Sequence, residues 1–70
     1  DFENARITAS SALARNSNIA EPHRVLAVIQ ETQGVYDGAR QEYETYLQLL
    51  PQAADADQIR MKLSRPPFAQ

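Results

Sequence analysis

The sequence predicts an all-α protein of about four helices, and three observations carry this prediction. Alanine, the strongest helix former, recurs along the 70 residues, whereas only two glycines are present. The four prolines stand at the edges of segments in which apolar residues recur at steps of three and four. No stretch of useful length alternates between apolar and polar residues, so we expect no β-strand.

The first two predicted helices cover residues 2–15 and about 21–32. Asp1 is expected to cap the first helix, because its carboxylate can accept hydrogen bonds from the free N–H groups of the first turn. Pro22 suits the first turn of the second helix, where its missing N–H costs nothing. Gly34 follows that helix at the position where a left-handed residue usually ends a helix.

The third and fourth predicted helices cover about 36–50 and 54–64. The third keeps apolar residues at helical spacing along its whole length, and Pro51 marks its end. The fourth carries a narrower apolar stripe, and the prolines at 66–67 forbid its continuation. The phenylalanine at position 68 is expected either to fold back onto the helices or to remain free.

The chain also contains an internal repeat of 34 residues. When the sequence is shifted by this distance, aromatic, small and basic residues fall on residues of the same kind, and leucine falls on leucine. The pairs are Phe2 with Tyr36, Ala5 with Ala39, Arg6 with Arg40 and Leu13 with Leu47, and a fifth pair sets Ala9 on Tyr43.

The period and the residues within it resemble the tetratricopeptide repeat (TPR) family of helical repeats. Residues 20–53 resemble one complete repeat; the residues that carry the pattern are Leu26, Ala27, Gly34, Tyr36, Ala39, Tyr43, Leu47 and Pro51. The sequence departs from the family pattern at His23, Gln30 and Tyr46. The resemblance implies antiparallel helix pairs stacked in a right-handed α-solenoid.

The small and large residues of this repeat have a physical role that does not depend on the resemblance. A small side chain at Ala27 lets the second helix approach the third closely, and Ala39 is its expected contact. Tyr43 and Leu47 are expected to pack against the following helix.

Outside the complete repeat, the chain divides into three parts. Residues 1–19 match the second half of an earlier repeat, and 54–65 form a C-terminal capping helix, in which Arg60 falls on the small close-contact site. Residues 66–70 are a tail. The first helix therefore lacks part of its cover, and we expect either that the chain is a fragment of a longer array or that two chains complete each other.

The resemblance implies a protein-interaction scaffold that binds a peptide segment or partner protein along its concave face. The residues expected on that face are Glu21, Arg24, Val25, Val28, Glu31 and Thr32. Arg24 fits a basic position that chaperone-binding TPRs use to grip a carboxylate, but Val25 stands where those proteins have asparagine. Two alternatives stay open: structural self-association, and an accessory domain of a larger protein whose activity lies outside this chain.

Composition and motifs argue against other functions. The net charge is −2 without a basic run, which argues against nucleic acid as a partner. No apolar stretch is long enough to insert into a membrane. The chain has no cysteine, and the single histidine, His23, has no neighbouring residues at metal-ligand spacing. The serines lack a nucleophile motif, so we expect neither an enzyme nor a cofactor.

Overall fold

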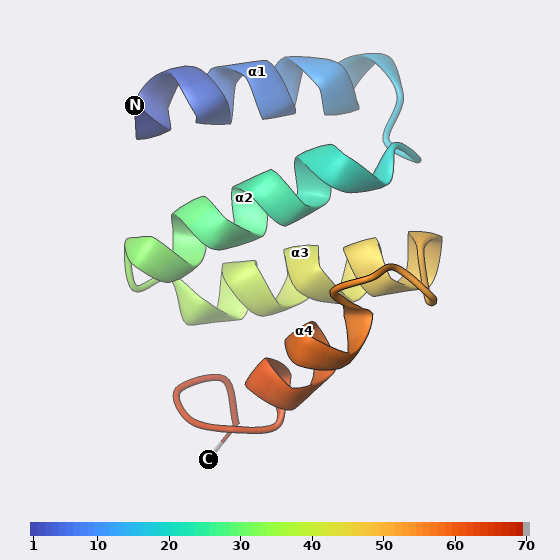
Figure 1. The fold of residues 1–70 in the computed structure, drawn as a ribbon. Helices are drawn as coiled ribbons and strands as arrows, with labels where there is room; N and C mark the ends of the chain where they lie inside the picture. Colours follow the sequence, from blue (N-terminus) through green and yellow to red (C-terminus); the bar gives the residue numbers. More distant parts are fainter. Residues whose placement is uncertain (70) are drawn as a thin grey trace.

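The computed structural model describes residues 1–69 and contains four α-helices and, within these residues, no β-strand (Figure 1). The helices are α1 (Phe2–Arg15), α2 (Ala20–Thr32), α3 (Tyr36–Leu49) and α4 (Ala56–Leu63). The prediction of an all-α fold with four helices is confirmed. The predicted bounds differ from the observed ones by one or two residues at the ends of α2, α3 and α4.

The helices α1 and α3 reproduce the 34-residue displacement of the sequence. Both have 14 residues; α1 covers residues 2–15 and α3 covers 36–49. The helix α4 is less regular: it begins 36 residues after α2 and has only 8 residues, whereas α2 has 13. Between α3 and α4 the chain makes a turn, in which the N–H of Ala53 donates to the carbonyl of Leu50.

Two helix ends form as the sequence predicts. The carboxylate of Asp1 accepts a hydrogen bond from the N–H of Glu3 at 3.1 Å and caps α1. Gly34 has a φ of 80° after the end of α2. The N–H of Val35 then donates to the carbonyl of Gln30 at 2.8 Å, a Schellman bond that satisfies a free carbonyl and reverses the chain.

The four helices lie side by side in the order of the sequence (Figure 1). The helix α1 packs against α2, α2 packs against α3, and α4 packs against α3. The molecule measures 33 × 26 × 16 Å, so its smallest dimension is little more than the diameter of one helix with its side chains. Of the described helices, α1 packs only on α2, and Ala9 is its only buried residue.

The core lies where α2, α3 and α4 meet. Ala27 and Ala39 are fully buried, as expected for the close contact between α2 and α3. The core cluster contains Ala27, Tyr43, Tyr46, Ile59 and Leu63, and Leu47 packs on it while partly exposed. The predicted packing of Tyr43 against the following helix is therefore confirmed.

The C-terminal tail folds back onto this core. The ring of Phe68 contacts the rings of Tyr36 and Tyr43 edge to face, with centroids 5.6 and 6.0 Å apart. The guanidinium of Arg40 donates to the carbonyls of Leu63 and Phe68 at 2.6 and 2.9 Å, and thereby fixes the tail to α3. Of the two outcomes expected for Phe68, the structure shows the folded one.

A close contact explains Gly38 in the first turn of α3. A Cβ atom at this position would lie 2.9 Å from the side-chain oxygen of Gln30 and 3.3 Å from Val35. That Gln30 oxygen is buried and has no hydrogen-bond partner among residues 1–69. Gln30, which departs from the TPR pattern, therefore places a polar atom without a hydrogen-bond partner between α2 and α3, and this lowers the stability of the fold.

Candidate functional site

The exposed face of α2 carries the six residues that the sequence assigns to partner binding. Glu21, Val28 and Thr32 are exposed. Arg24, Val25 and Glu31 are half-buried. Val28 keeps 39% of its surface exposed although it is apolar. The face separates two hollows, because Glu21 and Val25 line one of them and Arg24 and Val28 line the other.

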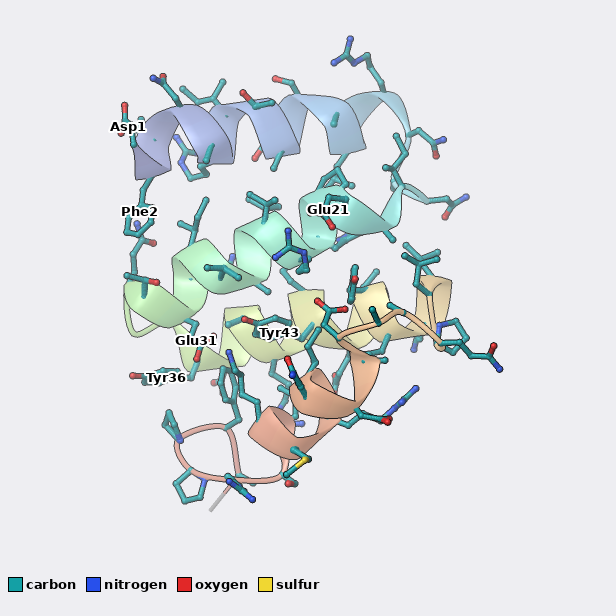
Figure 2. The ribbon with its side chains drawn as sticks, viewed as in Figure 1. Asp1, Phe2, Glu21, Glu31, Tyr36 and Tyr43 are labelled. Carbon is teal, nitrogen blue, oxygen red and sulfur yellow. The ribbon has the colours of Figure 1, made fainter. Side chains whose placement is uncertain are left out.

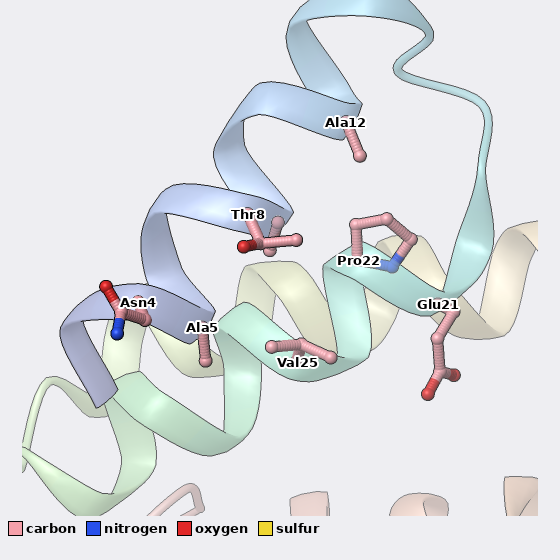
Figure 3. A pocket seen from close by; sticks show the side chains of 8 residues that line it. Asn4, Ala5, Thr8, Ala12, Glu21, Pro22 and Val25 are labelled. Atoms are coloured by element: carbon pink, nitrogen blue, oxygen red, sulfur yellow. The ribbon is translucent and has the colours of Figure 1, made fainter. Parts of the chain in front are cut away.

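The first hollow, here called the α1–α2 cleft, has a volume of about 430 Å³. It is lined by Asn4, Ala5, Thr8, Ala9 and Ala12 of α1 and by Glu21, Pro22 and Val25 of α2. Figure 3 shows the space between the two helices, with Ala12 above Pro22 and Ala5 beside Val25. Small and apolar side chains dominate its walls, and Glu21 stands at its edge.

The second hollow, the α2–α4 groove, is smaller, at about 170 Å³. It is lined by Arg24, Val28, Tyr43, Asp55, Gln58, Ile59 and Lys62. The cationic side chains of Arg24 and Lys62 and the carboxylate of Asp55 lie beside apolar side chains. The groove therefore suits a segment that carries both polar and apolar residues. Sequence reasoning missed Asp55, Gln58 and Lys62, because it assigned 54–65 to a cap. The 34-residue period was the signal that could have found them.

The side chains of Tyr43, Glu31 and Lys62 form a network beside the groove. Figure 2 labels two of its members, Glu31 on α2 and Tyr43 on α3. The Tyr43 hydroxyl donates to Glu31 Oε1 at 2.8 Å, and Lys62 Nζ donates to the same oxygen at 3.0 Å. Burial, followed by the hydrogen bond to Glu31, raises the pKa of Tyr43. Lys62 lies on the exposed side of α4, and its long side chain reaches back to the carboxylate of Glu31 on α2.

The pKa of Lys62 shows which effect prevails in this network. Desolvation acts to lower the pKa, but the hydrogen bond to Glu31 and the interactions with Tyr43 act together in the opposite direction. The net result is a raised pKa, so the ammonium stays charged. Lys62 therefore joins α4 to α2 by an ion pair across 31 residues of sequence.

A second tyrosine hydroxyl contacts the residue that precedes α4. Tyr46 donates to Asp55 Oδ1 at 2.8 Å, and this hydrogen bond is the main cause of the raised pKa of Tyr46. Asp55 precedes α4 but makes no side-chain bond to its free N–H groups. The carboxylate of Asp55 binds the tyrosine instead and thereby joins α3 to the residue before α4.

Arg24 is paired with Glu21 one turn earlier on the same face. The guanidinium contacts the carboxylate through two nitrogens, which lowers the pKa of Glu21 and raises that of Arg24. The charge of Arg24 is thus already balanced within α2, which does not favour a carboxylate grip. An exposed pair of this kind contributes about 1 kcal/mol or less, so a partner can replace it at low cost.

His23 joins three segments of the chain. Its Nδ1 lies 2.7 Å from Glu42 Oε1 on α3, and its Nε2 lies 2.9 Å from the carbonyl of Ser17 in the α1–α2 turn. Both neighbours accept hydrogen bonds, and only the imidazolium can donate from both nitrogens. Desolvation acts to lower the pKa of His23, but the bonds to Glu42 and Ser17 prevail and raise it.

We expect the raised pKa of His23 to make the protein less stable at alkaline pH. A group whose pKa is higher in the folded state stabilises the fold fully below its unfolded value of 6.5, and this contribution is lost as pH rises through the folded pKa. Urea denaturation followed by circular dichroism, repeated from about pH 6 to pH 9, should show a falling midpoint. His23→Gln should flatten this part of the curve; an unchanged slope would contradict the assignment.

The remaining observations on residues 1–69 concern metals, membranes and relatives. Within this range no three His, Asp or Glu side chains gather as a metal site would require. None of the helices in the described part of the chain has the length and apolar character needed to cross a membrane. No family model matches the sequence, and neither a curated protein nor a solved structure matches it.

Proposed function

We propose that this chain is a TPR-like interaction scaffold that binds an extended segment or helix of a partner protein along α2 and the α2–α4 groove. The observation that carries the proposal is the open face of α2. Its residues lie between two hollows, and Val28 stays exposed although α2 lies between α1 and α3 in the layer. Mixed apolar and charged grooves of this kind accommodate peptides and helices.

The arrangement of the helices supports the TPR-like part of the proposal. α1 and α3 are equal in length and displaced by 34 residues, which is the TPR period. Gly34 makes the reversal between α2 and α3, and Ala27 and Ala39 are fully buried where these helices pack. We propose that the helix pairs of this chain stack as a right-handed α-solenoid.

A binding role is proposed in preference to catalysis, and the contacts of the titratable groups support it. Both ring nitrogens of His23 already have partners, so this histidine has no lone pair directed at a substrate. In the α2–α4 groove, Asp55 is bonded to Tyr46, and Lys62 to Glu31. Such mutually satisfied groups hold a surface in place rather than transfer protons.

The test is selection of peptides that bind the chain, followed by measurement of their affinity for matched variants. We expect Val28→Asp to weaken binding of a selected peptide about tenfold or more, because it places a charge on the apolar centre of the face. Gln48→Asp, an exposed change on α3, is the control and should bind as the parent does. Equal binding by both variants would place the site elsewhere.

A second candidate, structural association through α1, is favoured by one observation. α1 buries only Ala9 and leaves Phe2 and Ile7 about half exposed. Such a face gains from a neighbouring repeat, a second copy or another domain of a larger protein. Sedimentation of the chain at increasing concentration separates these cases, since only a second copy gives a concentration-dependent dimer.

A further inference from the structure

The C-terminal tail, residues 65–69, is anchored to the helices mainly through one residue. It curves back from the end of α4 towards the first turn of α3 (Figure 1). Residues 65–67 are exposed, whereas Phe68 packs against the core while partly exposed. The described backbone hydrogen bonds of Arg65 stay within the turn, to Lys62 and from Ala69. Phe68 therefore holds the tail in place.

Three residues on one face of α3 receive Phe68 and are here called the α3 aromatic site: Tyr36, Arg40 and Tyr43. The Phe68 ring meets the two tyrosine rings edge to face, with centroids 5.6 and 6.0 Å apart. Arg40 Nη2 donates to the Phe68 carbonyl at 2.9 Å. Every residue has a main-chain carbonyl, so the two rings make the site selective for an aromatic side chain.

The α3 aromatic site has supports that do not involve the tail. Arg40 also donates to the carbonyl of Leu63 at 2.6 Å and to the carboxylate of Glu44 at 3.2 Å. The Tyr43 ring is 2% exposed, and its hydroxyl donates to Glu31. These contacts persist when Phe68 leaves, so the site keeps its shape. A site of this kind binds a ligand without the cost of ordering its own side chains.

The tail, in contrast, has little to keep it closed. Phe68 and Ala69 are only partly buried, and the three residues before them are exposed. Terminal segments with few buried contacts open locally at a small free-energy cost. Opening of the tail exposes the α3 aromatic site while α3 and α4 stay in place.

We propose that the α3 aromatic site is a second peptide-binding site, which takes an aromatic residue of an extended partner segment and which the tail of this chain closes when no partner is bound. The tail itself shows the chemistry of the ligand, an aromatic ring whose own carbonyl accepts from Arg40. The site goes beyond the proposed function, which uses α2 and the α2–α4 groove; of its three residues, only Tyr43 also lines that groove.

The proposed occupant is a segment of another protein and not the tail of a second copy. A tethered tail acts at an effective concentration of about 1 mM, so an identical tail from a second copy competes only near that concentration. A segment of another protein overcomes the tether through additional contacts beside the site, where Val35 is 49% and Tyr36 38% exposed.

The first experiment uses a fluorescently labelled peptide with the sequence of residues 64–69, and fluorescence anisotropy measures its affinity. Phe68→Ala opens the site, so we expect this variant to bind the peptide about tenfold more tightly than the parent, in which only a small fraction is open. A peptide with alanine in place of its phenylalanine should not bind. Absence of binding to Phe68→Ala, or equal affinity of the parent and Phe68→Ala, would overturn the proposal, as would equal affinity of the two peptides.

Matched variants test the position of the site. Added to Phe68→Ala, Arg40→Met removes the donor to the peptide carbonyl and should weaken binding about tenfold. Arg15→Met, an exposed change on α1, should leave the affinity unchanged. Val28→Asp lies in the α2–α4 groove and should also leave it unchanged. Equal effects of the two arginine variants would refute the site, and loss of binding in Val28→Asp would place the peptide in the groove.

A third measurement uses the parent chain and holds even if Phe68→Ala fails to fold. The chain has two phenylalanines, Phe2 and Phe68, so labelling with 4-fluorophenylalanine gives two fluorine NMR signals. Unlabelled peptide at millimolar concentration should move the signal of residue 68 towards that of an exposed ring, while the signal of residue 2 stays in place. An unmoved signal of residue 68 would show that the tail is not displaced, and would overturn the proposal.

Sedimentation of the parent chain and Phe68→Ala distinguishes the two occupants. We expect Phe68→Ala to leave the association state unchanged at micromolar concentration. A dimer of the parent that Phe68→Ala abolishes would assign the site to the tail of a second copy, and would overturn the proposed occupant.

Discussion

Tyr43→Ala is expected to unfold most of the chain at room temperature. The ring is 2% exposed, belongs to the core cluster, and carries the hydroxyl that binds Glu31. Removal of a buried aromatic ring costs about 3–5 kcal/mol, and a core of this size rarely supplies more than about 3–5 kcal/mol of net stability. Urea denaturation followed by far-ultraviolet circular dichroism measures the change.

Tyr36→Ala is the matched control for this substitution. Tyr36 stands on the same helix but is 38% exposed, and its described ring contact is with Phe68. Loss of that edge-to-face contact should cost about 1 kcal/mol. Equal destabilisation by the two substitutions would mean that the core does not centre on Tyr43.

Ala27→Trp is expected to destabilise the fold to a similar extent, because it overfills the core, whereas Tyr43→Ala leaves part of the core empty. Ala27 is fully buried within the core cluster that α2 shares with α3 and α4. An indole has no room there, so the helices must separate; overpacking of this kind costs about 3 kcal/mol at the upper end of its usual range. The unfolding midpoint in urea measures the loss.

Ala14→Trp provides the comparison for Ala27→Trp. Ala14 is exposed on α1, so the same change of size should alter the free energy of unfolding by about 0.5 kcal/mol or less. If Ala27→Trp proved equally mild, the close approach of α2 and α3 at Ala27, and with it the proposed repeat register, would be wrong.

Local signals in the sequence accounted for the helices and for one side of the candidate site. Proline and glycine positions and the three- and four-residue spacing predict four helices, because these properties act within a few turns of one helix. The six residues expected to bind a partner do lie on one face of α2. Two of them, Arg24 and Val28, line the α2–α4 groove.

The other side of that groove depends on contacts between residues that are distant in sequence. Lys62 meets Glu31 across 31 positions, and His23 meets Glu42 across 19. No short motif marks such pairs, because they depend on the angle at which one helix crosses another. The delay of α4 by two residues relative to the 34-residue period is likewise a property of the turn before it.

The sequence by itself determined the helices, their limits to within two residues, and the 34-residue period, since propensity, capping and apolar spacing are local properties. Only the tertiary structure decided that the tyrosines of α3 fill one end of the layer while the alanines of α1 leave the other end open. The physical reason is that burial depends on what covers a side chain. The same position in the repeat is core where α2 lies over a tyrosine, and a cleft where no described helix lies over an alanine.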